Sequence, residues 1–271
     1  MERRQFLQAS LVASGLTSSE KPFSAAGQGD KPNQQFIQLR HYSLTPAGDM
    51  KLCDNYLRDA LIPAANRLGI RPIGVFNTWF GPQGFTDKWL ILPGPSVEVL
   101  ANLDTHLSDD RAYLKLGEPF LNAPVNQPPF SHLETSLLRT MTAFPRVSVP
   151  ESMAKSPTRI FELRTYVQPT HRSHELKVSL FQEGGEAASL EKDGFPAVFY
   201  AVNIVGSGIP GASLPSLTYM WVYDSLATRQ KAEEVWMNDP MVHALMNDAK
   251  YANIPSTITN IIMRPTPYSQ L

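Results

Sequence analysis

The sequence predicts an α+β fold in which two similar halves each follow the order β-α-β-β-α-β. A six-residue pattern at 37–42 (IQLRHY) returns at 161–166 (FELRTY). Apolar and polar residues alternate in both copies, as they do in a strand with two different faces. The helix-capping residues of the first half also return in the second, and the register between copies changes only between elements. We therefore expect two domains within the 271 residues.

Composition excludes several classes of protein. Hydrophobic residues make up 42% and charged residues 18%, which is typical of a folded globular chain. The formal net charge of -1 gives no electrostatic reason to expect nucleic acid or an anionic membrane as a partner. Cys53 is the only cysteine, so an intrachain disulfide and a cysteine-based metal cluster are both excluded.

Residues 1–30 have the pattern of a leader. The sequence MERRQFLQ resembles the twin-arginine export motif, and it precedes a weakly apolar stretch that is too short to span a bilayer. Small residues at 24–26 (SAA) supply a cleavage site. We expect export to the periplasm or secretion, with only transient membrane contact through the leader. The alternatives are a disordered or mitochondrial-type basic leader, and retention of the leader as an anchor stays open.

The first half, residues 34–142, begins with a strand at 36–43 and a helix. Asp49 is placed to cap this helix, Pro63 should kink it and Gly69 should end it. The helix has apolar residues at spacings of three and four: Met50, Cys53, Leu57, Ala60, Leu61, Ala64 and Leu68.

A hairpin and two further helices complete the first half. Strands are predicted at 70–80 and 86–92, joined by a Gly/Pro turn. Ser96 caps the next helix, Asp110 starts a further short helix, and a strand at 133–141 follows a proline-rich loop.

Residues 143–157 contain three prolines and little periodicity, which is typical of a linker. The second half, residues 158–271, repeats every element of the first. The elements expected there are strands at 160–166, 195–205, 217–223 and 257–264, a helix with Leu176, Leu180, Phe181, Ala187 and Leu190, and helices capped by Ser225 and Asp239.

A family resemblance rests on FELRTY at 161–166, YMWVY at 219–223 with Ser225 and Arg229, and NDP at 238–240. This part of the chain resembles the NIPSNAP family, within the dimeric α+β barrel superfamily. The first half matches more loosely, because Gln38 replaces the glutamate and Asp110-Arg111 stands in for Asp-Pro.

The resemblance implies a ferredoxin-like fold and a barrel, and the repeat predicts that two ferredoxin-like halves close into one eight-stranded, pseudo-two-fold barrel. It implies no particular reaction. The superfamily includes haem-degrading monooxygenases, haem-bound peroxidase-like enzymes and small isomerases.

Candidate ligand-binding residues come from the alternation in the first strand of each half. If Ile37 and Leu39 face the helices, the polar series faces the barrel interior. We then expect a polar pocket in which two arginines bind an anionic group, or alternatively a glutamate–arginine network that joins the sheets. The residues so placed are Gln38, Arg40, Tyr42, Glu162, Arg164 and Tyr166.

Aromatic residues on the hairpin strands add a second candidate feature. Tyr219, Trp221 and Tyr223 share one face of their strand. They could line a cavity for a flat apolar ligand, with Trp221 as a binding residue, or form part of the core.

Metal, nucleotide and haem sites are not expected. His171 and His174 have no third ligand nearby in the sequence, and Pro210 blocks the helix that the GSGIPG motif at 206–211 would need for a dinucleotide. The alternation turns His41 towards the helices, which leaves only the tyrosines Tyr42 and Tyr166 as interior iron ligands. No cofactor is therefore predicted.

We identify no catalytic constellation in the sequence. The favoured function is an exported NIPSNAP-like protein that binds a small ligand or a partner through the barrel cleft, with homo-oligomerisation left open. The alternative is a cofactor-poor monooxygenase or isomerase of the barrel superfamily acting on an aromatic or polycyclic ligand, and the catalytic residues are unknown.

Overall fold

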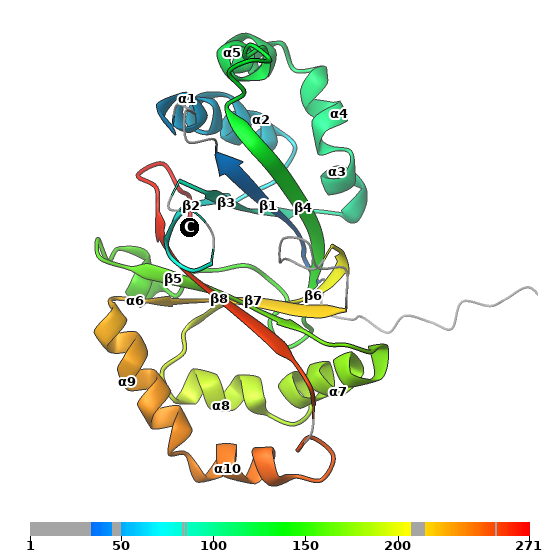
Figure 1. Ribbon diagram of the computed structural model, residues 1–271, viewed down its shortest axis with the longest axis vertical. Coiled ribbons are helices and arrows are strands. Elements are labelled where there is room, and N and C mark those ends of the chain that lie inside the picture. Colours follow the sequence, from blue (N-terminus) through cyan, green and yellow to red (C-terminus); the bar gives the residue numbers. More distant parts are fainter. Residues whose placement is uncertain (1–33, 45–49, 83, 85, 207–214, 253) are drawn as a thin grey trace, which may run out of the picture. The chain divides into compact units, whose positions relative to one another are not determined.

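A computed structural model describes residues 34–44, 50–82, 84, 86–206, 215–252 and 254–271 (Figure 1). The predicted leader and most of the GSGIPG motif lie outside these residues. In the described part, eight strands form a closed barrel in the order β1-β3-β2-β8-β5-β7-β6-β4. No helix in these ranges is both long enough and apolar enough to cross a bilayer.

The first half contains the expected elements and divides its helices further. Pro63 lacks the backbone N–H that would donate a hydrogen bond to the preceding helical turn. A π-helical turn, η1, comes immediately before the helix that contains Pro63. Ser96 and Asp110 cap their helices through the backbone N–H groups of Val99 and Tyr113. The elements are β1 (Phe36–Leu44), α1 (Met50–Asn55), η1 (Tyr56–Leu61), α2 (Ile62–Arg67), β2 (Gly74–Phe80), β3 (Lys88–Gly94), α3 (Val97–Ala101), α4 (Leu103–Ser108), α5 (Arg111–Leu121) and β4 (Phe130–Thr140).

The second half follows the same order after a short helix, α6 (Glu151–Ala154), in the predicted linker. Ser225 accepts a hydrogen bond from Thr228 N, and Asp239 accepts one from Met241 N, so both predicted caps are confirmed. The elements are β5 (Ile160–Val167), α7 (His171–Gln182), α8 (Glu186–Lys192), β6 (Ala197–Val205), β7 (Ser216–Tyr223), α9 (Leu226–Met237), α10 (Pro240–Asn247) and β8 (Thr257–Pro265).

All neighbouring strands pair antiparallel, and the order within each half is the same. The first half runs β4-β1-β3-β2 and the second runs β8-β5-β7-β6. The two halves join through β2 with β8 and through β4 with β6. This closes the barrel, so that each of the eight described strands has a partner on both sides.

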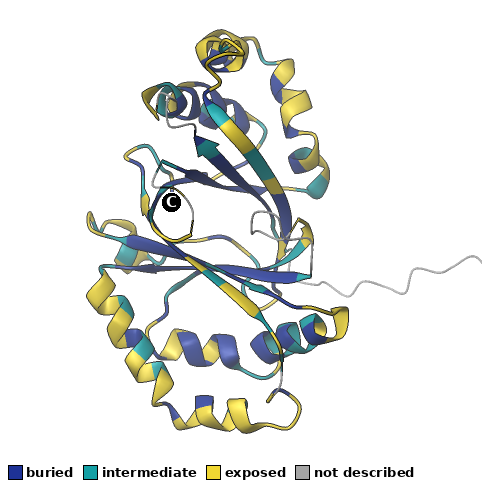
Figure 2. Cartoon of the chain, in the orientation of Figure 1, coloured by how far each residue is buried: buried dark blue, intermediate teal, exposed yellow. Residues whose placement is uncertain are grey.

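The interior of the barrel is an apolar core. Ile37 and Leu39 of β1 lie in one cluster with Phe161 and Leu163 of β5. The rings of Phe76 and Phe161 meet across the two halves at 4.7 Å. Figure 2 shows that the strands are mostly buried, whereas the outward faces of the helices are exposed.

The predicted orientation of the first strands is therefore wrong. Alternation shows that a strand has two different faces, but it does not say which face meets the other sheet. Here the space between the sheets takes the apolar series. The polar series instead faces the helices, where long side chains can reach polar partners and the solvent at the edge of this layer. The residues corrected in this way are Gln38, Arg40, Tyr42, Glu162, Arg164 and Tyr166, and His41 lies on the interior side with Trp89.

The segment 143–157 packs against the barrel rather than only connecting its halves. Val147 is buried in the interior cluster, and Val149 and Met153 pack against the same cluster. Ser148 N donates a hydrogen bond to Val198 O of β6.

Candidate functional site: cavities beneath helices α7 to α10

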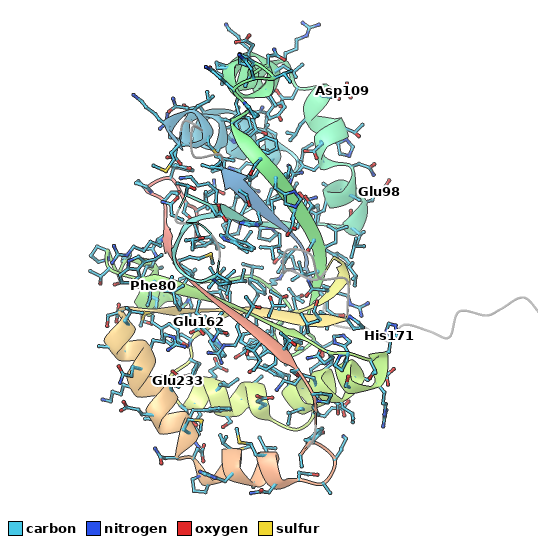
Figure 3. The ribbon with its side chains drawn as sticks, in the orientation of Figure 1. Phe80, Glu98, Asp109, Glu162, His171 and Glu233 are labelled. Atoms are coloured by element: carbon cyan, nitrogen blue, oxygen red, sulfur yellow. The ribbon has the colours of Figure 1, made fainter. Side chains whose placement is uncertain are left out.

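A buried charge network joins β5 to α9. Glu162 is fully buried, and its carboxylate accepts hydrogen bonds from Arg164 Nη2 at 2.6 Å and from Arg229 Nε at 2.7 Å. Arg229 Nη1 also donates to Glu233 at 2.9 Å, one turn further along α9. Figure 3 shows Glu162 on the sheet and Glu233 on the helix that covers it. The two arginines and two carboxylates compensate each other's charge.

Arg164 keeps its charge in this environment. Burial lowers its pKa, but the interactions with Tyr219 and Glu162 outweigh burial and raise the pKa above its ordinary value. The guanidinium lies 4.8 Å from the centre of the Trp221 ring. Trp221 is held in turn by a hydrogen bond from its Nε1 to Tyr200 Oη at 3.0 Å.

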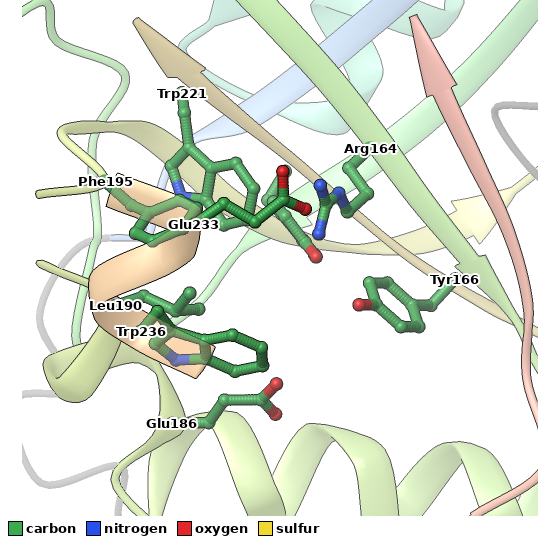
Figure 4. A pocket seen from close by; sticks show the side chains of 9 residues that line it. Arg164, Tyr166, Glu186, Leu190, Phe195, Trp221, Glu233 and Trp236 are labelled. Atoms are coloured by element: carbon green, nitrogen blue, oxygen red, sulfur yellow. The ribbon is translucent and has the colours of Figure 1, made fainter. Parts of the chain in front are cut away.

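A small inner cavity of about 20 Å³ opens beside this network. It can hold about one water molecule. Burial raises the pKa of Tyr219, so this hydroxyl remains protonated at neutral pH. Figure 4 shows the side chains of Arg164, Tyr166 and Glu233 converging on this space. The lining residues are Arg164, Tyr166, Glu186, Leu190, Phe195, Tyr219, Trp221, Glu233 and Trp236.

A larger outer cavity of about 300 Å³ lies between α7, α8, α9 and α10. It adjoins the inner cavity, since Glu186 and Trp236 line both. An engineered core cavity of about 150 Å³ holds benzene, so this space suits a ligand of roughly two fused rings. The lining residues are Lys177, Leu180, Glu186, Trp236, Val242, Leu245, Met246, Tyr251, Ala252 and Ile254.

A second buried ion pair lies at the junction of the two cavities. Lys177 Nζ donates to both oxygens of Glu186, at 2.9 and 3.2 Å, and both residues are buried. The ammonium also lies 4.5 Å from the ring centre of Tyr166 and 4.8 Å from that of Phe181. These rings hold Lys177 in place, and Lys177 fixes the carboxylate of Glu186 at the cavity wall.

The corresponding residues of the first half lie in a different layer. Arg40 donates to Gln38 Oε1 at 2.6 Å and to Asp104 Oδ1 of α4 at 2.9 Å. Tyr42 packs edge-on against Phe130, with ring centres 5.4 Å apart. Arg40 and Tyr42 are therefore not brought together with Arg164, Tyr166 and Trp221, which do line one cavity.

His41 belongs to neither of these layers. Its Nε2 lies 2.8 Å from Asp87 Oδ2, and its ring stacks on Trp89 with centres 4.1 Å apart. Burial lowers its pKa, although the hydrogen bond to Asp87 opposes this change. The sequence argument that turned His41 away from the barrel interior is therefore wrong. The described residues contain no group of three His, Cys, Asp or Glu that could hold a metal ion.

Sequence reasoning missed three residues that shape the cavities. Lys177, Glu186 and Glu233 come from three helices; Lys177 and Glu186 pair between two of them, and Glu233 pairs with Arg229 on its own helix. Charged residues on amphipathic helices usually face solvent, so no local pattern marked them. Arg229 was noted only for the family resemblance, yet it is the link between Glu162 and Glu233.

Two solved structures share this fold, and a third is similar at a lower score. A proposed monooxygenase from Fusobacterium nucleatum aligns with a TM-score of 0.51 at 5% identity, covering 86% of this chain and 93% of that one. An anthrone oxidase-like protein aligns with a TM-score of 0.51 at 12% identity, covering 87% and 93%. A proposed monooxygenase from Lactobacillus acidophilus aligns with a TM-score of 0.48 at 8% identity, covering 85% and 94%.

Sequence comparison gives a family match for the second half. No curated protein matches the chain. The NIPSNAP family model matches residues 161–270, which include the charge network and all the residues that line the two cavities. Residues 161–270 are thus similar to the NIPSNAP family, and the described residues have an α+β fold that resembles the dimeric α+β barrel proteins.

Proposed function

We propose that the protein binds a small, largely apolar molecule in the outer cavity of its second half. The observation that carries this proposal is a space of about 300 Å³ whose wall includes Leu180, Val242 and Leu245, next to a smaller inner cavity that Arg164 and Glu233 also line. Ligand sites typically combine an apolar wall with a few fixed polar groups. The space between the two sheets is less suited, because apolar side chains from both halves fill it.

Binding of a neutral fluorescent probe tests this function. N-phenyl-1-naphthylamine should bind at one saturable site, and Leu245→Trp should abolish binding because the larger ring fills the cavity. Leu114→Trp on α5 is the matched control, since Leu114 is exposed in the first half. Unchanged binding to Leu245→Trp, or equal loss in both variants, would refute the site.

A cofactor-poor oxygenase is the second candidate. It is favoured by two structures of similar fold that are described as a proposed monooxygenase and an anthrone oxidase-like protein. The cavities also place the carboxylates of Glu186 and Glu233 where they could accept a proton from an aromatic substrate. Oxygen consumption that accompanies loss of an added anthrone, and that stops in Leu245→Trp, would promote this function. Binding without oxygen consumption favours the ligand-binding function proposed first.

We infer that the leader directs twin-arginine export and is removed near Ala26. The inference is supported by the paired arginines, the short apolar stretch and the small residues that follow. Mass spectrometry of the protein from its native host decides it. A cytoplasmic species with residues 1–26 intact would contradict export, whereas an uncleaved membrane-bound species would contradict only the removal.

We also infer that the halves at 34–142 and 158–271 are ferredoxin-like copies of one ancestral unit. Support comes from their common strand order and from caps at Ser96 and Ser225 in corresponding helices. If this is correct, residues 32–157 and 158–271 made as separate chains should associate into a one-to-one complex. Failure of two individually soluble halves to associate would count against the inference.

A further inference from the structure

The cations that face the cavities are paired with carboxylates in the described structure. Arg164 and Arg229 share Glu162, Arg229 also binds Glu233, and Lys177 binds Glu186. Of these groups, Arg164, Lys177, Glu186 and Glu233 line the cavities, and Arg229 and Glu162 lie behind them in the same network. The sequence had suggested that Arg164 binds an anionic group, but its guanidinium is already bound to Glu162 at 2.6 Å.

An anionic ligand would meet an unfavourable environment here. It would lose part of its hydration on entering the space between the helices, and it would gain no cation without breaking an existing pair. It would also lie against the carboxylate of Glu186, which lines both cavities, and any part of it that reached the inner cavity would meet the carboxylate of Glu233. Repulsion between like charges is strong at such short range in a partly buried site.

We propose that the cavity selects an uncharged ligand of about two fused rings, and that Glu233 is the residue that enforces this selection. The proposal rests on the proposed binding function and adds its ligand class. Glu233 is the candidate because its carboxylate is about half exposed, lines the inner cavity and points towards Arg164 (Figure 4). Glu162 is fully buried and joins the sheet to α9, so its removal would disturb the fold.

Two probes of the same size separate the charge classes. At pH 7.5, 2-acetylnaphthalene is neutral and 2-naphthoate is an anion. Binding is measured by titration calorimetry on the wild-type chain, Glu233→Gln and the control Glu234→Gln. Glu234 is exposed on the same helix, where it accepts a hydrogen bond from Gln230 and does not line the cavities.

The wild-type chain should bind 2-acetylnaphthalene about tenfold more tightly than 2-naphthoate. Glu233→Gln should bind 2-naphthoate about tenfold more tightly than the wild type does, while 2-acetylnaphthalene changes less than about twofold. Glu234→Gln should match the wild type for both probes.

Tighter wild-type binding of 2-naphthoate, or an unchanged ratio of the two affinities in Glu233→Gln, overturns the proposal. Saturable binding of both probes that is lost in Leu245→Trp would then leave the binding function intact and only the ligand class wrong. If neither probe binds, the proposed function and the ligand class fail together.

Discussion

At the scale of single residues, the side chains with the strictest requirements are the buried charges. Glu162 has no exposed surface and satisfies two arginines at once. Removal of one member of a buried ionic group is costly because the remaining charge loses its partner without regaining water. Glu162 therefore helps to fix the position of α9, and with it the cavity wall that α9 forms.

Glu162→Ala should lower the free energy of unfolding by about 3–5 kcal/mol, because Arg164 and Arg229 remain partly buried without their carboxylate. Urea unfolding followed by circular dichroism measures this change. Glu234→Ala, on the exposed side of α9, should stay within about 0.5 kcal/mol of the wild type. Equal effects of the two substitutions would show that the network does not stabilise the fold.

His41 should make the protein less stable as the pH falls from 7.5 to 5.5. Burial lowers its pKa in the folded chain, so the unfolded chain binds more protons once the pH falls below about 6.5. Asp87 and Glu134 raise the pKa of His41, and His132 lowers it. Burial also lowers the pKa of His174, so His174 adds to the loss of stability at low pH. Unfolding measured across this range should show a smaller loss in His41→Gln. A variant that loses as much stability as the wild type would contradict this.

At the scale of elements, the sequence predicts what depends on local chemistry. Strand positions and the caps at Ser96, Asp110, Ser225 and Asp239 are confirmed, because period and capping are read from neighbouring residues. The direction in which a strand faces was wrong, since it depends on a sheet that is distant in the chain. The cavities were not predicted for the same reason. Lys177, Glu186 and Glu233 lie on different helices and line the cavities only once helices α7 to α10 have packed together.

Removal of the α9 cap should destabilise the second half by a modest amount. Ser225 accepts a hydrogen bond from Thr228 N, and Ser225→Ala should cost about 1 kcal/mol. Thermal unfolding measures the change, and Thr105→Ala at an exposed position of α4 serves as the control. A Ser225→Ala variant as stable as this control would show that the cap contributes nothing measurable.

At the scale of the whole barrel, both halves depend on one shared core. Phe161 of the second half contacts Phe76 of the first, and both are fully buried in the cluster between the sheets. Phe161→Ala should lower the free energy of unfolding by about 3–5 kcal/mol through lost burial and a residual cavity. Both halves should still unfold in a single transition. Separate transitions, detected by hydrogen exchange in the two sheets, would mean that the core does not couple them.

The central claim is that the second half holds an uncharged small molecule in the outer cavity among helices α7 to α10. The most direct measurement is a crystal structure of the protein purified from its own host, with native mass spectrometry of the same sample to weigh any retained molecule. The account predicts electron density beside Leu180, Val242 and Leu245 for a neutral, largely apolar compound. Density between the two sheets, or an anion bound to Arg164 in place of Glu162, would contradict it.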